Sequence, residues 1–234
     1  MLAPGREVQL PAAAARHVAA VLRMRAGDAL TLFDGNGGEY TSTILRADRS
    51  GVEVSIQARR AIEREAPNPI TLVQAVIAAD NMDLIVRKAV ELGAAAVVPV
   101  IAERSQGIAD ERAARRVARW REIAIAACEQ CGRNRIPAIA DILPLAKWMT
   151  ERGGQSAPTI MLVPGASASL ASALRTTIPH ALVVGPEGGF TSAETASLTE
   201  AGTIAAHLGA RVLRAETAAI AALAIWSAIA GDAA

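Results

Sequence analysis

The chain has 234 residues, enough for one large domain or two modest ones that each bury a core. Apolar residues make up 52% of the chain but aromatic residues only 3%, so the core must consist mainly of Ala, Val, Leu and Ile. This composition favours α/β layers over an aromatic-rich β-sandwich. The net charge of +1 excludes a polycationic chain, so nucleic acid could bind only at local clusters of basic residues.

Residues 1–65 predict a small β-rich domain. One helix at 12–22 is followed by three strand-like runs, at 29–33, 39–45 and 52–57. The Asp-Gly-Asn-Gly-Gly segment at 34–38 suits a turn with positive φ angles. A charged segment at 61–69 contains two prolines and predicts a linker.

From residue 70 the pattern changes to alternating strands and helices. The apolar run at 70–78 is typical of a strand buried on both faces, and the helix after it is expected to be capped by Asp80 or Asn81 and ended by Gly93. Further strands are expected at 95–101, 159–163 and 181–185, and further helices at 110–130 and 216–230. This series predicts an α/β domain with a mostly parallel sheet.

Two other features of the sequence concern location and metals. The first seven residues carry a Pro-Gly pair and charges where a secretory signal needs an apolar stretch. The apolar stretch at 218–230 is shorter than the roughly 20 residues that span a bilayer, so we expect a cytoplasmic protein. Cys128 and Cys131 have no second cysteine pair to complete a zinc site, which indicates a reduced structural pair and no bound metal.

Ligands of parallel α/β sheets bind beyond the carboxyl ends of the strands, so the loops there form the candidate site. The Gly-Pro-Glu-Gly-Gly segment at 185–189 follows a strand and precedes a helix that Thr191 and Glu194 are expected to close with a capping box. This segment lacks the Gly-x-Gly-x-x-Gly spacing of dinucleotide sites and the Gly-Lys-Ser/Thr of triphosphate sites, which disfavours a dehydrogenase or a kinase. A second candidate loop, at 208–217, precedes the C-terminal helix.

A row of arginines lies on one face of the helix expected at 110–130. Arg112, Arg115, Arg116 and Arg119 are spaced i, i+3, i+4 and i+7, which places them on the same side. The row predicts either a phosphate-binding stripe or an ordinary solvated face, and the sequence leaves both interpretations open.

The C-terminal helix expected at 216–230 is apolar on most of its circumference. Such a helix must be buried on several sides, and its own sheet covers only one of them. A second copy of the chain is the simplest cover, because small alanines allow two helices to approach closely across a two-fold axis. The sequence therefore predicts a homodimer.

Four ordered groups of segments carry a family resemblance over nearly the whole chain. They are 22–28 with 32–35, 88–93 with 99 and 103–104, 126–133 with 136–137, and 185–189 with 208–217. Together they resemble the bacterial 16S ribosomal RNA small-subunit methyltransferase E family, within the SPOUT class. The resemblance implies a PUA-like small β-barrel that binds RNA at 1–65, a SPOUT α/β domain with a deep trefoil knot at 66–234, and a homodimer. The chain starts late against this family pattern, so the first barrel strand is expected to be missing.

The same resemblance implies S-adenosylmethionine as the cofactor and methylation of N3 of a specific uridine in the decoding region of 16S rRNA, within the small ribosomal subunit. The implied cofactor-binding residues lie at strand ends and in the two loops: Val163, Val184, Gly185, Pro186, Glu187, Gly188, Gly189, Leu208, Gly209, Arg211, Val212, Leu213 and Arg214. The residues expected to bind RNA are His17, Arg23, Arg25, Arg112, Arg116, Arg133 and Arg135.

Uridine N3 carries a proton at neutral pH, so the implied reaction needs a proton acceptor or a group that stabilises the anion. Arg104 and Arg133 are candidates for stabilising charge on the uracil oxygens, and Glu129 and Glu187 for accepting the proton. Two alternatives stay open. One is a non-catalytic RNA-binding or ribosome-assembly factor, and the other is a SPOUT enzyme that methylates the ribose 2′-oxygen.

Overall fold

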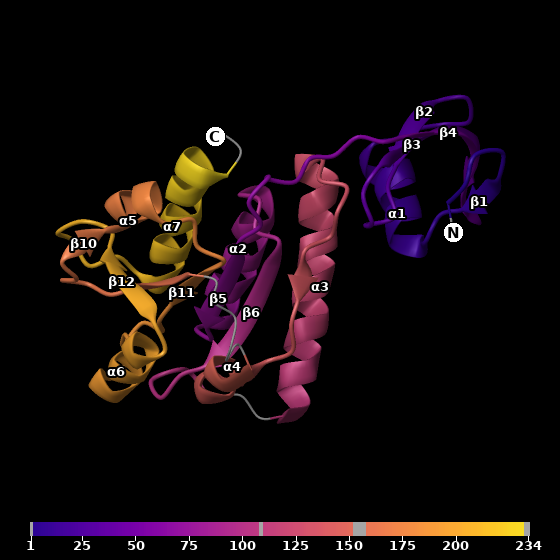
Figure 1. The fold of residues 1–234 in the computed structure, drawn as a ribbon. Coiled ribbons are helices and arrows are strands. Elements are labelled where there is room, and N and C mark those ends of the chain that lie inside the picture. Colours follow the sequence, from indigo (N-terminus) through magenta and orange to yellow (C-terminus); the bar gives the residue numbers. More distant parts are fainter. Residues whose placement is uncertain (1, 108–109, 152–157, 232–234) are drawn as a thin grey trace. The chain divides into compact units, whose positions relative to one another are not determined.

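A computed structural model describes residues 2–107, 110–151 and 158–231 of the chain (Figure 1). The chain forms two compact units, the first made of Met1–Arg64 with Gly132–Ile136 and the second of Glu65–Cys131 with Pro137–Ala234. The sequence placed 132–136 in the second domain, whereas in the structure this segment packs with the first unit. Each unit is described by itself.

The first unit is a four-stranded antiparallel sheet with a short helix. Its strands, in sheet order, are β1 (Glu7–Gln9), β4 (Gly51–Arg60), β3 (Glu39–Asp48) and β2 (Ala29–Leu32). Alternate residues of β4 are buried, as expected for strands with one face on a core, and Val52 and Val54 join a cluster with Val18 of the helical segment. Strand β1 could not be predicted from the sequence, because three residues are too few to show an alternating pattern.

The single helix expected at 12–22 is wrong in detail. A short α-helix, α1 (Ala12–Arg16), continues as a π-helical turn, η1 (His17–Val21), in which Leu22 N donates to His17 O at 3.0 Å. Arg23 then takes a φ of 55°, a left-handed conformation that no other non-glycine residue adopts in the described parts of the chain.

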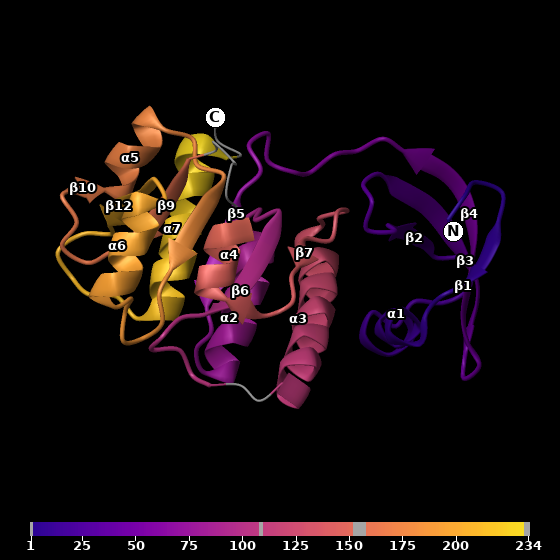
Figure 2. The ribbon, with the colours of Figure 1, turned by 60° about the horizontal axis from the view of Figure 1, so that its bottom comes forward.

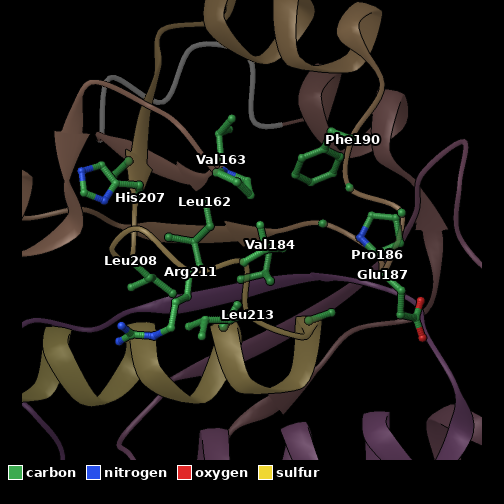
Figure 3. A pocket seen from close by; sticks show the side chains of 18 of the residues that line it. Leu162, Val163, Val184, Pro186, Glu187, Phe190, His207, Leu208, Arg211 and Leu213 are labelled. Atoms are coloured by element: carbon green, nitrogen blue, oxygen red, sulfur yellow. The ribbon is translucent and has the colours of Figure 1, made fainter.

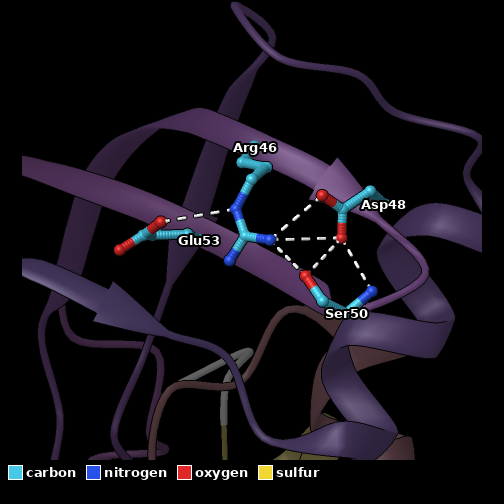
Figure 4. A network of polar contacts seen from close by, with 4 residues as sticks. All are labelled: Arg46, Asp48, Ser50 and Glu53. Atoms are coloured by element: carbon cyan, nitrogen blue, oxygen red, sulfur yellow. Dashed lines mark hydrogen bonds and ion pairs between the residues drawn. The ribbon is translucent and has the colours of Figure 1, made fainter.

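The turn between β3 and β4 holds a surface network of polar side chains (Figure 4). The Arg46 guanidinium lies between Asp48 on one side and Glu53 on the other, with N–O distances of 3.0 and 3.6 Å. Hydrogen bonds from the Ser50 hydroxyl and backbone N–H, together with Arg46, lower the pKa of Asp48 to about 2. The negative charge of Asp48 therefore orders this turn.

The loop between β2 and β3 packs on the 132–136 segment. Gly37 N donates to Asn134 O at 3.1 Å, and Ile136 N donates to Gly35 O at 3.2 Å. Gly37 has a φ of 88°, and a Cβ atom there would lie 2.6 Å from an Arg135 nitrogen. The positive φ favours glycine at this close approach of two segments that are distant in the sequence.

The second unit contains an eight-stranded sheet in which every strand pair is parallel. Its strands, in sheet order, are β10 (Ala168–Ser169), β12 (Thr203–His207), β9 (Thr159–Leu162), β11 (Ala181–Val184), β5 (Thr71–Ala75), β6 (Ala96–Ile101) and β7 (Ala138–Ile139), with β8 (Leu143–Pro144) also paired to β6. The expected α/β class with a parallel sheet is therefore confirmed. The trefoil knot stays a prediction.

Helices cover this sheet (Figures 1 and 2). They are α2 (Ala79–Glu91), α3 (Asp110–Cys131), α4 (Leu145–Glu151), α5 (Leu170–Thr176), α6 (Ser192–Glu200) and α7 (Ala215–Ala230). Helices α4 and α6 pack on one sheet face, because Leu145 and Leu198 share a buried cluster with Val73 and Val183. Helix α2 packs against α3 and α7.

Helix α2 differs from its expected start. Its N-cap is Ala78, without a side-chain cap, so the expectation that Asp80 or Asn81 caps it is wrong. Both lie inside the first turn, because the helix begins almost directly after β5. Gly93 follows the last turn with a φ of 82°, as expected of a residue that ends a helix.

Helix α7 is buried on one side by Ala219, Leu223 and Trp226, whereas Ala224 and Ala228 are exposed. Within the described residues, neither α7 nor any other helix combines the length and apolar character that crossing a bilayer requires.

Candidate cofactor and active site

Three loops at neighbouring strand ends enclose one cavity of about 270 Å³ (Figure 3). They follow β9, β11 and β12, and because β9 lies between the other two in the sheet, the loops meet at one edge. The residues that line the cavity are Leu162, Val163, Pro164, Val184, Gly185, Pro186, Glu187, Gly188, Gly189, Phe190, Thr195, Ala206, His207, Leu208, Gly209, Arg211, Val212, Leu213, Ala215 and Ala218.

The glycines of these loops occur where a side chain would strain the backbone or crowd a neighbour. Gly189 and Gly209 have φ angles of 67° and 112°, which L-residues rarely adopt. A Cβ atom on Gly185 would lie 3.3 Å from the Phe190 ring, and one on Gly188 would lie 3.2 Å from Arg104 Cδ. The bare backbone of the loop is thus needed both for its own turn and for the packing of two neighbouring side chains.

The walls of the cavity are mainly aliphatic, with polar groups at the rim. Figure 3 shows Leu162, Val184 and Leu213 side by side, while the Glu187 carboxylate points away from them. His207 Nδ1 accepts a hydrogen bond from Gly209 N at 2.9 Å, which ties the β12 end to the loop after it. An apolar cavity with few polar groups is typical of a site for a small organic cofactor.

The structure brings together nearly all residues that the sequence assigned to cofactor binding. Twelve of the thirteen residues line this cavity, and the exception, Arg214, is the exposed N-cap of α7. Several lining residues were not predicted from the sequence: Leu162, Pro164, Phe190, Thr195, Ala206, His207, Ala215 and Ala218. Leu162 and Ala206 could have been predicted from their places at the ends of β9 and β12, because the loops after neighbouring parallel strands meet at the same edge of a sheet.

The four candidate catalytic residues lie in different places. Arg104 Nη1 donates to Gly188 O at 2.8 Å, so this guanidinium contacts the cofactor loop directly. Glu187 belongs to that loop, and its Oε1 accepts from Ala78 N at 3.4 Å. Glu129 is exposed on α3 and does not line the cavity. Arg133 belongs to the first unit and is only 5% exposed.

A single carboxylate joins the loop after β6 to the start of α6. The expected capping box is present, with Thr191 Oγ1 accepting from Glu194 N at 3.2 Å and Glu194 Oε2 accepting from Thr191 N at 2.8 Å. The other oxygen of Glu194 accepts from Glu103 N at 2.7 Å. The sequence analysis treated Glu194 only as a helix cap.

The arginine row on α3 is not uniform. Arg112 and Arg115 are exposed, and Arg116 is half-buried. Arg119 is engaged in an ion pair with Asp83 of α2, with an N–O distance of 2.6 Å, and the hydrogen bond and charge of Asp83 raise the pKa of Arg119. Arg119 therefore links two helices while its side chain stays 66% exposed, and both interpretations of the row stay open.

The other residues expected to bind RNA belong to the first unit. His17, Arg23 and Arg25 are exposed around η1 and the turn that follows it. Arg135 is exposed and pairs with Glu63 at 2.8 Å.

The two cysteines do not form a disulfide, Cys128 being buried and Cys131 exposed. Over the described ranges, no group of three or more His, Cys, Asp or Glu side chains is arranged to hold a metal ion.

Comparisons with known proteins agree with this architecture. Residues 64–227 match the RNA methyltransferase domain family, and residues 10–57 match the RNA methyltransferase PUA domain family. Ribosomal RNA small subunit methyltransferase E of Mycobacterium tuberculosis is 34% identical over 214 residues, which cover 88% of this chain and 80% of that protein.

Two solved structures resemble the whole chain. Ribosomal RNA small subunit methyltransferase E from Neisseria gonorrhoeae, bound to S-adenosylmethionine, aligns with a TM-score of 0.90 at 36% identity and covers 99% of this chain and 95% of its own. The methyltransferase Lpg2936 from Legionella pneumophila, in complex with the same cofactor, aligns with a TM-score of 0.89 at 37% identity. The alignment covers 99% of this chain and 96% of that protein. The chain therefore belongs to the RNA methyltransferase family that includes ribosomal RNA small subunit methyltransferase E.

Proposed function

We propose that this chain transfers a methyl group from S-adenosylmethionine to N3 of a specific uridine in the decoding region of 16S rRNA. One observation carries the proposal: the two loops that the sequence singled out line the same cavity. The names of the relatives and the cofactor bound by the two solved structures support it. The uridine and its N3 atom come from the family resemblance.

The chemistry of the cavity fits this cofactor. Its aliphatic walls, among them Leu162, Val184 and Leu213, suit the faces of an adenine ring, while backbone groups of the glycine loop suit its polar edge. When bound, S-adenosylmethionine supplies a methyl group on a positively charged sulfur. We expect the residues of the two loops, without Arg214, to hold it.

Two residues of this chain are well placed for the substrate side of the reaction. Arg104 is exposed and uses one nitrogen to bind Gly188 O, which leaves other N–H groups of the guanidinium to stabilise negative charge on a uracil oxygen. Glu187 is the favoured proton acceptor, because it is exposed in the same loop. Glu129 has less support, since it does not line the cavity. Arg133 belongs to the first unit and remains a candidate for RNA binding.

The proposed partners are 16S rRNA within the small ribosomal subunit and a second copy of the chain. Exposed arginines at 112, 23 and 25 are proposed to neutralise RNA phosphates. A ribosomal substrate places the proposed activity in the cytoplasm.

Nucleoside mass spectrometry tests the proposal. Small subunits from a strain that lacks the gene are incubated with the purified protein and S-adenosylmethionine, and their 16S rRNA is digested. We expect one 3-methyluridine per rRNA. A methylated ribose would instead support the 2′-O-methyltransferase alternative, and the absence of any methylation would support a non-catalytic RNA-binding factor.

A further inference from the structure

We propose that Glu194 is a positioning residue that acts through Arg104 in the proposed methyl transfer. The inference rests on the proposed function, because Arg104 is the group that Glu194 is proposed to position. It assigns to the capping-box carboxylate a second role that helix capping does not require.

The first step concerns how Glu194 uses its two oxygens. A capping box needs one carboxylate oxygen, and here Oε2 fills that role by accepting from Thr191 N at 2.8 Å. Oε1 accepts from Glu103 N at 2.7 Å, in a loop that is 91 residues away in sequence. The half-buried carboxylate of Glu194 therefore connects the loop after β6 to Thr191, which follows the glycine loop.

The second step concerns the neighbour of Glu103. Arg104 Nη1 donates to Gly188 O at 2.8 Å, and its Cδ would lie 3.2 Å from a Cβ atom built on Gly188. Arg104 is thus held at two points, by its guanidinium on the glycine loop and by Glu194 through the Ala102–Glu103 peptide, one residue earlier in the chain. The backbone turn is closed further by Ser105, whose Oγ accepts from Ala102 N at 3.0 Å.

Together these bonds form a bridge: Glu194 of α6 binds Glu103, and the neighbouring Arg104 binds Gly188 of the glycine loop. Without the Glu194 bond to Glu103, the turn that carries Arg104 keeps only its internal bonds between Ala102 and Ser105, so we expect the guanidinium to be less closely held over the loop. Since a displacement of about 1 Å can lower a rate on the order of a hundredfold, Glu194 has a measurable effect on catalysis if Arg104 acts there.

The test compares Glu194→Ala with Thr191→Ala. Both variants remove half of the capping box, but only Glu194→Ala removes the bond to Glu103 N. The first readout is hydrogen exchange of the peptide that contains Glu103, in the protein without cofactor. We expect exchange at Glu103 to be about fivefold faster in Glu194→Ala, the effect of one lost hydrogen bond, and unchanged in Thr191→Ala.

The second readout is the kinetics of methyl transfer to small subunits. We expect Glu194→Ala to lower kcat on the order of tenfold or more, with the KM for the subunits and the Kd for S-adenosylhomocysteine within about twofold of wild type. Combining Glu194→Ala with Arg104→Ala should be no slower than Arg104→Ala alone, because one residue acts through the other.

Three results separate the possible failures. Equal losses of kcat in Glu194→Ala and Thr191→Ala, or multiplicative losses in the double variant, overturn the positioning role while the proposed function stands. Unchanged exchange at Glu103 overturns the bridge itself. A wild-type protein that exchanges as expected but transfers no methyl group contradicts the proposed function and, with it, the catalytic part of this inference.

Discussion

The imidazole of His207 accepts a hydrogen bond from Gly209 N at 2.9 Å, and both residues line the cavity. This bond holds the backbone at the start of the second loop, where Gly209 has a φ of 112°. A site in which binding depends on backbone groups is sensitive to such a bond, because a loose loop must be ordered when the ligand binds.

We therefore expect His207→Ala to raise the Kd for S-adenosylhomocysteine about fivefold to tenfold, the effect of one lost hydrogen bond of about 1 kcal/mol plus lost wall contacts. Isothermal calorimetry measures this directly. His180→Ala is the matched control, because His180 is exposed and does not line the cavity. Equal affinities for the His207 and His180 variants would remove this side chain from the binding site.

Replacing Gly189 by valine tests the glycine loop. Gly189 has a φ of 67°, and a β-branched residue there must either strain the backbone or change the loop, so we expect no measurable binding of S-adenosylhomocysteine. Gly202→Val is the control, because Gly202 has a similar φ of 79° but lies in the turn before β12, outside the cavity. Both variants should lose a similar amount of Tm. Retained binding in Gly189→Val would contradict the role of this loop.

The sequence predicted the elements whose signals are local. The capping box of Thr191 and Glu194 is confirmed, since it depends on residues three apart in one turn. The π-helical turn at 17–21 and the uncapped start of α2 were not predictable, because tertiary packing decides them. His207 was missed for a similar reason: a lone histidine at a strand end has no local pattern, and its bond to Gly209 is visible only when the loop is in place.

The place of Gly132–Ile136 in the first unit was not predictable from local signals either. This segment follows a long helix of the second unit, which Gly132 ends with a φ of 81°, but no local signal shows that the segment packs with the first unit. Its partners are the glycines of the loop before β3, so only the folded chain shows why both segments carry the residues that they do. The Glu194 bond to Glu103 is likewise a contact between segments that no periodicity links.

Because of the arginines on α3, we expect the affinity for RNA to depend on salt concentration. Arg112 is exposed and Arg116 half-buried, and we expect Arg112→Ala with Arg116→Ala to lower the salt slope of RNA binding by up to about two, roughly one per lost phosphate contact. Filter binding at several salt concentrations measures the slope. Arg49→Ala with Arg175→Ala is the control, since both arginines are exposed and belong to other elements. An unchanged slope in the Arg112 and Arg116 variant would identify these arginines as ordinary solvated residues.

The β3–β4 turn is expected to contribute stability at neutral pH that is lost at acid pH. The folded-state pKa of Asp48 is about 2, below its ordinary value of 3.8, so its stabilising effect is present above pH 3.8 and is lost as pH falls towards 2. We expect Asp48→Asn to lower Tm at pH 7 and to have the same Tm as wild type near pH 2. Ser50→Ala should show the same trend, because Ser50 is the main cause of the shift. A Tm difference that stays constant from pH 7 to 2 would contradict this.

The last prediction concerns assembly and the exposed side of α7. Ala224 and Ala228 are exposed, and they share a helix face with Thr217 and half-buried Ala221, at spacings of three and four residues. The helix begins directly after the second loop, at 208–214, and contributes Ala215 and Ala218 to the cavity, so a partner subunit on α7 would lie next to the site. Small side chains permit close approach of a second α7 across a two-fold axis.

We therefore expect a homodimer at micromolar concentration, measured by light scattering. Ala224→Glu with Ala228→Glu should produce monomers, because four carboxylates would meet in one interface, and these monomers should bind S-adenosylhomocysteine more weakly. Both positions are exposed, so the fold of each chain should survive, with an unchanged circular dichroism spectrum. Ile178→Asp is the control, since Ile178 is a 54% exposed apolar residue outside α7. A wild-type monomer with full methyl transfer would show that α7 needs no partner.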